Sequence, residues 1–91
     1  MYLEIVNPEA SLVSGEVESV TVPGVDGEFQ MLKGHAPIVS VLQDGKVKFR
    51  GNPTIAEAFR NRFSKEGEKW TFHITGGTVE CKNDRVVILA D

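Results

Sequence analysis

Residues 16–42 read EVESVTVPGVDGEFQMLKGHAPIVSVL, and this stretch decides the fold class of the chain. Apolar and polar residues alternate through EVESVTV at 16–22 and through EFQML at 28–32, where Phe29 and Met31 share one face. A period of two is typical of strands with one buried side. The uneven spacing of the three valines in 16–22 predicts a bulge or bend in that strand.

Turn-forming pairs separate the predicted strands. Pro23-Gly24 and Asp26-Gly27 predict turns before the strand at 28–32, because proline presets φ and glycine permits positive φ. Asp44-Gly45 predicts a hairpin between 38–42 and 46–50. The remaining predicted strands also end at turn residues, and the last two are joined by a tight Asn83-Asp84 turn: 2–7, 69–75, 78–82 and 85–90.

The segment 51–69 has a different pattern. Thr54 and Glu57 have the spacing of a capping box, and Ile55, Phe59 and Phe63 recur every four residues. These features predict an amphipathic helix over 54–64 that packs on the strands, followed by an exposed loop at 64–69. The sequence therefore predicts one all-β domain over 1–91, a β-sandwich or barrel with one short helical insertion at about 51–69.

Size and composition exclude several classes of protein. The 91 residues are 41% hydrophobic and 25% charged, which is ordinary for one soluble globular domain. No apolar run approaches the ~20 residues that span a bilayer, and the N-terminus resembles neither a secretory signal nor a transit peptide. Cys81 is the single cysteine, so no internal disulfide is possible, which fits a reducing compartment.

Charge is unevenly distributed along the chain. Residues 1–45 contain seven acids and one base, whereas residues 46–91 contain nine bases and six acids. An acidic half disfavours nucleic-acid binding, which needs clustered Lys and Arg. The asymmetry fits two differently solvated surfaces, or an acidic contact face for a basic partner.

No set of residues predicts catalysis or metal binding. His35, His73 and Cys81 are the only imidazole and thiol side chains, fewer than the four such ligands of most structural zinc sites. Ser40, His35 and Asp44 lack the motif of a nucleophile elbow, and the turn glycines lack the spacing of a phosphate-binding loop. We therefore expect no catalytic residues, no metal and no cofactor.

Several motifs resemble, in order and separation, the β-sandwich domain of the F-type ATP synthase epsilon subunit family. They are LEIVNP at 3–8, SGEVESVTVPG at 14–24, DGEF at 26–29, GHAP at 34–37, GGTVE at 76–80 and VVILAD at 86–91. The resemblance implies a sandwich of two five-stranded sheets. The chain resembles a short form of the subunit that lacks a C-terminal helical hairpin, so inhibition and nucleotide binding through such a hairpin are not implied.

The resemblance also implies a function. It indicates a non-catalytic central-stalk subunit that couples the membrane c-ring to the gamma shaft during proton-driven ATP synthesis. Such a subunit lies peripherally at the cytoplasmic face of a bacterial inner membrane, without inserting into it and without forming homo-oligomers.

The resemblance places contacts on individual residues. Gly27, Glu28 and Phe29 match a hairpin tip that faces the c-ring, although Glu28 alone could be a solvated turn acid. Asn7, His35 and Ser40 match positions close to gamma, and His35 could instead pack on the next strand. We expect the apolar run at 36–42 to be mostly sandwich core, with any exposed part available to gamma.

Two other function classes stay open on the residues alone. A free-standing β-sandwich could bind a small molecule or glycan, which an exposed Trp70 on a concave sheet face would favour. A small β-barrel enzyme is disfavoured, because no cluster of histidines and carboxylates is present.

Overall fold

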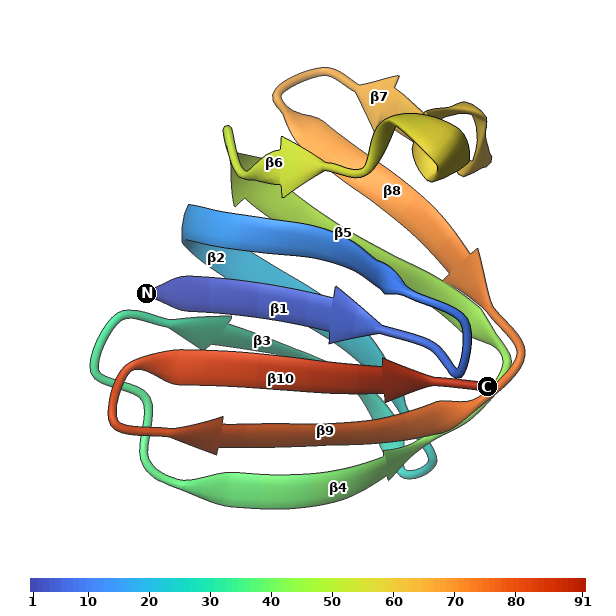
Figure 1. The fold of residues 1–91 in the computed structure, drawn as a ribbon. Helices are drawn as coiled ribbons and strands as arrows, with labels where there is room; N and C mark the ends of the chain where they lie inside the picture. Colours follow the sequence, from blue (N-terminus) through green and yellow to red (C-terminus); the bar gives the residue numbers. More distant parts are fainter.

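The computed structural model describes residues 1–91 and contains ten strands and one short 3-10 helix (Figure 1). In chain order the strands are β1 (Tyr2–Val6), β2 (Ser11–Gly24), β3 (Gly27–Leu32), β4 (Ile38–Leu42), β5 (Gly45–Gly51), β6 (Thr54–Ile55), β7 (Phe63–Glu66), β8 (Lys69–Ile74), β9 (Gly77–Lys82) and β10 (Arg85–Ala90). The 3-10 helix η1 (Glu57–Arg62) lies between β6 and β7.

The strands form two layers that share β2. Residues 11–16 of β2 pair with β1, and β10, β9 and β4 continue this first layer. Residues 19–24 of β2 pair with β3 on one side and β5 on the other, and β8 and β7 complete the second layer. The all-β prediction is confirmed. With β2 counted in both layers, the second layer has five strands and the first has six, because the two-residue β6 pairs with Val13 and Ser14 of β2.

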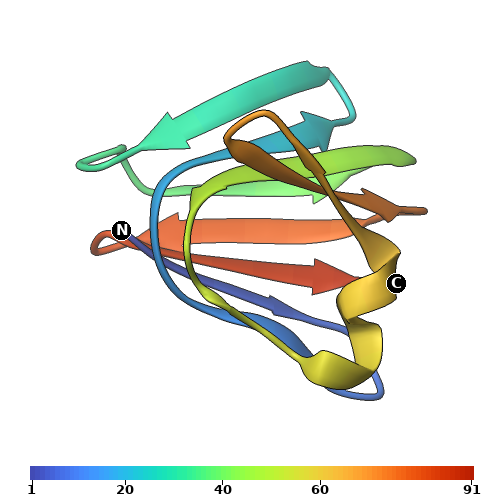
Figure 2. The ribbon, with the colours of Figure 1, turned by 90° about the horizontal axis from the view of Figure 1, so that it is seen from above.

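The bend in β2 makes the two layers one continuous hydrogen-bonded sheet. Its pairing with β5 shifts register between Val17 and Ser19, which confirms the predicted bulge. Figure 2 shows β2 curving from one layer into the other. At the far side a single pair, Gly24 with Leu42, links β2 to β4. A bulge strengthens the local bend of a strand, which allows one strand to serve both layers.

Alternation along the strands builds the core between the layers. In the first layer the buried residues are every second one, as with Leu3 and Ile5 on β1 and Val86 and Ile88 on β10. The second layer contributes Val20, Val22, Met31, Val47, Phe49, Phe72 and Ile74. All belong to one buried hydrophobic cluster, whose burial is the main favourable term in folding.

The predicted Asn83-Asp84 turn is confirmed. Both residues have positive φ, 53° and 59°, and they connect Lys82 to Arg85 in the antiparallel β9–β10 hairpin. Those angles match the two-residue turn that fits the twist of paired strands, and Asn and Asp tolerate them better than other non-glycine residues.

The predicted turn at Pro23-Gly24 is wrong, because β2 continues through both residues. Pro23 pairs with Glu28 and Gly24 with Gly27, and Val25 and Asp26 form the loop between them. A Cβ on Gly24 would lie 2.8 Å from the Gly27 carbonyl oxygen. This glycine therefore serves close packing at the tip of the hairpin.

Asp44-Gly45 does not close a hairpin either. β4 pairs with β9 in the first layer, whereas β5 pairs with β2 and β8 in the second. The pair therefore carries the chain between layers. A short turn signal does not distinguish a hairpin from such a crossover, since both need a sharp change of direction.

The predicted helix over 54–64 is wrong in type and extent. Thr54 and Ile55 are in β6, which pairs with β2, and Ala56 caps η1 with no side-chain hydrogen bond. No residue of η1 is buried. Phe63 is buried from β7, where it stacks on Phe72 at a centroid separation of 4.5 Å.

The predicted loop at 64–69 is only partly correct. Residues 63–66 form β7, which pairs with β8, and Gly67 and Glu68 make the turn between them. The exposed character of 64–68 agrees with the prediction.

The acidic and basic halves of the chain are interleaved in space. Glu4 lies 3.0 Å from Arg85, Glu18 lies 3.0 Å from Arg50, and Glu28 lies 3.5 Å from Lys48. Acids from the first half thus pair with bases from the second, which favours solvated, paired surfaces over a separate acidic face.

Candidate docking surface

The outer face of the first layer carries exposed apolar side chains. Val39, Val41 and Leu89 are 73%, 57% and 51% exposed. Strand register brings Val41, Thr78, Leu89 and Val6 opposite one another in one row across β4, β9, β10 and β1. These residues occupy the outward positions of strands whose other positions fill the core. We call Val6, Val39, Val41 and Leu89 the apolar face.

A groove runs along one end of the apolar face. It has a volume of about 570 Å³ and is lined on its apolar side by Val6, Val41, Leu42, Leu89 and Ala90. Contiguous exposed apolar surface on a small domain marks a place where another molecule binds. The groove therefore identifies the outer side of the first layer as the candidate docking surface.

Asn7 lies at the rim of this groove. Its side-chain Oδ1 accepts hydrogen bonds from the backbone N–H groups of Glu9 and Ala10, each at 2.9 Å. These bonds fix the turn that connects β1 to β2. Asn7 is thus near Val41 and Leu89, and its side-chain amide nitrogen remains available to a partner.

The other two predicted gamma contacts are Ser40, on β4, and His35, in the loop before β4. Ser40 is half-buried on β4 between exposed Val39 and Val41, and its Oγ donates to the Val41 carbonyl at 3.3 Å. His35 lies in the loop between β3 and β4, and Figure 1 shows this loop at the opposite end of the sandwich from the β1–β2 loop, which contains Asn7. The structure therefore spreads the three predicted gamma contacts along the layer rather than gathering them into one cluster.

The His35 loop is held by defined hydrogen bonds. The His35 N–H donates to the Leu32 carbonyl at 3.0 Å, and Gly34 has a φ of 81° in the turn between them. His35 Nδ1 donates to the Ala36 carbonyl at 2.7 Å. The Gly34 N–H donates to Asp84 Oδ1 at 3.3 Å, so a residue of the β9–β10 turn also supports the loop.

The three predicted c-ring contacts lie at the start of β3, beside the β2–β3 turn. Gly27 is exposed, and the Glu28 side chain is 54% exposed with its carboxylate 3.5 Å from Lys48 Nζ on β5. Phe29 is half-buried and packs against the core. Gly27 and Glu28 are therefore presented to solvent, whereas Phe29 braces the turn from inside.

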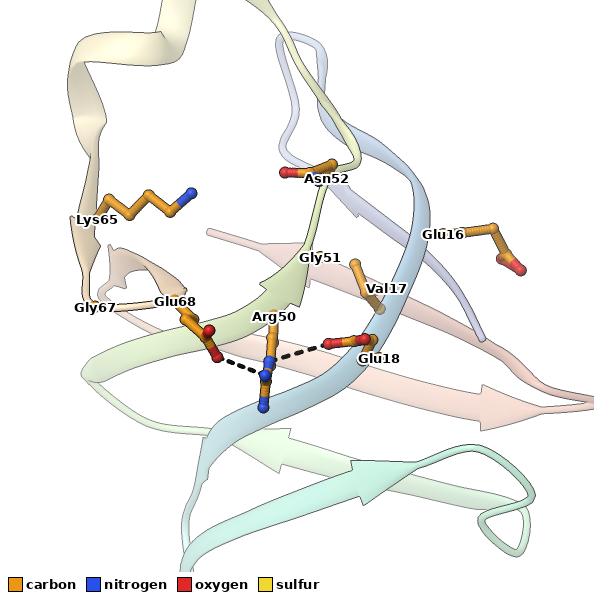
Figure 3. A pocket seen from close by; sticks show the side chains of 9 residues that line it. All are labelled: Glu16, Val17, Glu18, Arg50, Gly51, Asn52, Lys65, Gly67 and Glu68. Atoms are coloured by element: carbon orange, nitrogen blue, oxygen red, sulfur yellow. Dashed lines mark ion pairs between the residues drawn. The ribbon is translucent and has the colours of Figure 1, made fainter.

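A polar hollow of about 530 Å³ lies beside the bend of β2 and the β7–β8 turn (Figure 3). Arg50 occupies its floor, between Glu18 at 3.0 Å and Glu68. Figure 3 shows Lys65 on the opposite wall and Glu16 pointing away. The lining has no His, Cys or Ser, so it offers paired charges rather than an acid, a base and a nucleophile.

Cys81 lies in the hydrophobic core, and Trp70 packs against it. Cys81 is buried on β9, and burial, with the nearby Asp84 carboxylate, raises the pKa of its thiol. Trp70 is half-buried against the core, with Arg60 Cζ and Lys65 Nζ 5.4 Å and 5.2 Å from its ring centroid. Trp70 therefore does not form an open sugar-binding platform.

Sequence reasoning left any exposed part of 36–42 to gamma but did not say which of its residues face outward. The polar Ser40 between two valines was the available signal, since it shows that the two sides of the strand differ. The role of Asp84 had no sequence signal beyond the turn itself.

Comparison with known proteins places the chain in a family. The ATP synthase delta/epsilon chain β-sandwich domain model matches residues 1–91. The ATP synthase epsilon chain of Chlorobaculum tepidum is 37% identical over 89 residues, covering 98% of this chain and 86% of the relative. That of Dehalococcoides mccartyi strain CBDB1 is 38% identical over 90 residues, covering 98% of this chain and 54% of the relative.

A solved structure has the same fold. A chain in the central stalk and c-ring structure of Tetrahymena thermophila mitochondrial ATP synthase matches 99% of this chain, with a TM-score of 0.74 and 16% identity, and 62% of that chain is covered. The structure of this chain has no helix with the length and apolarity needed to cross a membrane. By its family model and its relatives, the chain belongs to the ATP synthase delta/epsilon family, within that family's β-sandwich domain.

Proposed function

We propose that this chain is a non-catalytic central-stalk subunit that couples the c-ring to the gamma shaft of a proton-driven ATP synthase. Family membership supports the assignment, as do the apolar face and the absence of a catalytic set in the largest hollows. The function needs a stiff body with two contact surfaces. A two-layer sandwich with one buried core supplies that body.

The apolar face carries the proposal. Val39, Val41 and Leu89 are exposed on strands whose alternate residues face inward and are buried or half-buried. Covering such side chains removes apolar surface from water, which contributes a favourable free energy of about 25 cal/mol per Å². We assign this face to gamma, with Asn7 at the groove, Ser40 in β4 and His35 at the other end of the layer as further contacts.

The β2–β3 turn is the proposed c-ring contact. Glu28 can exchange its half-exposed Lys48 partner for a donor on a c-ring loop, because an ion pair at the surface contributes only about 0–1 kcal/mol. Gly27 lets a loop approach closely, and Phe29 anchors the turn in the core. These two contact surfaces would transmit torque between ring and shaft.

The proposed function sets location and partners. The chain would sit peripherally at the cytoplasmic face of a bacterial inner membrane, with gamma and the c-ring as partners and without a cofactor. The curated relatives are bacterial epsilon chains, which supports this assignment. We expect the chain to occupy the stalk as a single copy.

Site-specific cross-linking tests the proposal. A photo-reactive residue at position 41 of the chain, reassembled with the complex, should cross-link to gamma. The same residue at position 30, on the outer side of the second layer, is the matched control and should give much less product. Equal gamma cross-linking from both positions, or none from position 41 in an intact complex, would rule out the assigned face.

A further inference from the structure

The Asp84 carboxylate joins three segments that are distant in sequence. Its Oδ1 accepts a hydrogen bond from the Gly34 N–H at 3.3 Å, and its Oδ2 lies 3.4 Å from the N-terminal amine of Met1. That amine also lies 3.7 Å from Glu16 on β2. One side chain in the β9–β10 turn therefore contacts the start of β1 and the loop between β3 and β4.

The choice of aspartate in this turn is informative. Asp84 has a φ of 59° at the second position of a two-residue hairpin turn, after Asn83. Glycine is the favoured residue at that position, since Asn-Gly is the strongest signal for this turn. Aspartate accepts the less favourable backbone conformation and adds a carboxylate, which the hairpin itself does not need.

The Gly34 N–H donates a hydrogen bond to the Asp84 carboxylate. The turn at 32–35 is closed by the His35 N–H and the Leu32 carbonyl, so it leaves the Gly34 N–H without a partner inside the turn. The loop then continues through Ala36 and Pro37 into β4, crossing from the second layer to the first. Asp84 thus ties this crossing to the first layer, next to His35.

We propose that Asp84 is a positioning residue that holds the Gly34–Pro37 loop, and with it His35, in the orientation that docks on gamma. The inference rests on the proposed function, because it gives the loop a partner. The hydrogen bond from Gly34, the N-terminal ammonium and Lys33 together lower the pKa of Asp84. The carboxylate is therefore fully charged at neutral pH, as a clamp on an N–H and an ammonium requires.

The substitution Asp84→Gly tests positioning separately from folding. It places the favoured Asn-Gly sequence in the turn, so the β9–β10 hairpin is kept or strengthened while the carboxylate is lost. We expect amide exchange of Gly34 to become roughly tenfold faster or more, because a restraining hydrogen bond is removed. We expect affinity for purified gamma subunit to fall about three- to tenfold, because the loop must be ordered on binding.

Two further variants complete the design. Asp84→Asn keeps an acceptor oxygen and tolerates positive φ, so it should retain much of the Gly34 protection and of the affinity for gamma. Glu16→Gln removes the other carboxylate near the amine, which does not contact Gly34, and should leave both measurements unchanged.

The outcomes separate this inference from the proposed function. Faster Gly34 exchange together with weaker gamma binding in Asp84→Gly supports the positioning role. Unchanged Gly34 exchange, or faster exchange with unchanged affinity, overturns it, while the proposed function stands as long as the wild-type chain binds gamma. Failure of the wild-type chain to bind gamma refutes the proposed function before any variant is compared.

Discussion

The two outer faces of the sandwich cover the same core but differ in chemistry. On the second layer, exposed or half-exposed charged side chains are paired: Lys46 with Glu66, Lys48 with Glu28, and Arg50 with Glu18 and Glu68. The His73 ring also lies 2.9 Å from Asp44. On the first layer, the outward positions include one ion pair, Glu4 with Arg85, but they also hold the apolar face of Val6, Val39, Val41 and Leu89.

This difference is the reason for proposing the first layer as the face that meets a partner. Paired charges keep a sheet surface solvated and add little to stability, since exposed pairs contribute about 0–1 kcal/mol. Exposed valine and leucine add nothing to the core and favour association. The buried sides of the two layers are alike, so folding does not require the difference between the faces, whereas the proposed docking would account for it.

The difference between inward and outward positions can be tested first within one strand, β10. Ile88 and Leu89 are neighbours on β10, but Ile88 is fully buried and Leu89 is 51% exposed. We expect Ile88→Ala to lower the free energy of unfolding by about 2–5 kcal/mol and Leu89→Ala by about 0.5 kcal/mol or less. Denaturant melts of the two variants measure this, and comparable losses would show that Leu89 belongs to the core.

Binding is the next test of the two faces. We expect Val41→Lys to weaken the complex with gamma about ten- to a hundredfold, because a charge would be buried where an apolar side chain docks. Gln30→Lys adds the same charge to the outer side of the second layer and serves as the control. Titration of gamma with each variant measures the effect, and equal weakening by both would erase the distinction between the faces.

Sequence alone predicted the strands and their buried sides well. The alternation of Phe29 with Met31 is local, and it survives folding because a strand has the same period in any sheet. The Asn83-Asp84 turn was also predictable, since its residues favour the backbone angles observed. Alternation says nothing about which strands pair, however, so it could not reveal that β2 serves both layers.

The errors have a common physical cause, which is long-range pairing. The spacing of Ile55, Phe59 and Phe63 fits a helix, yet Ile55 and Phe63 are buried because they pair with Val13 and Phe72 on other strands. Asp44-Gly45 connects the two layers because β5 pairs with β2 and β8, whereas β4 pairs with β9. Likewise, the docking surface depends on which side of β4 faces the core, and that is a property of the whole fold.

A smaller effect is expected at the β2–β3 turn. Glu28→Gln should change the free energy of unfolding by less than about 1 kcal/mol, because its pair with Lys48 is exposed. If Glu28 meets the c-ring, the same change should weaken attachment to c-ring-containing membranes about tenfold. Lys48→Gln breaks the same ion pair but keeps the acid, so only Glu28→Gln should affect attachment in a membrane co-sedimentation assay. Loss of attachment in both variants would assign the effect to the ion pair instead.

The smallest expected effect concerns pH and Asp84, a charged group in the β9–β10 turn. Its folded-state pKa is lowered, chiefly by the hydrogen bond from the Gly34 N–H and also by the N-terminal ammonium and Lys33. A group with a depressed folded-state pKa stabilises the fold above its unfolded pKa, about 3.9, and loses that contribution as pH falls through the folded value. The advantage of the wild type over Asp84→Asn in unfolding free energy should thus be constant from pH 7 to about 5 and shrink towards pH 3. Urea melts across this range measure it, and an advantage that grew on acidification would mean that the carboxylate is not held by these groups.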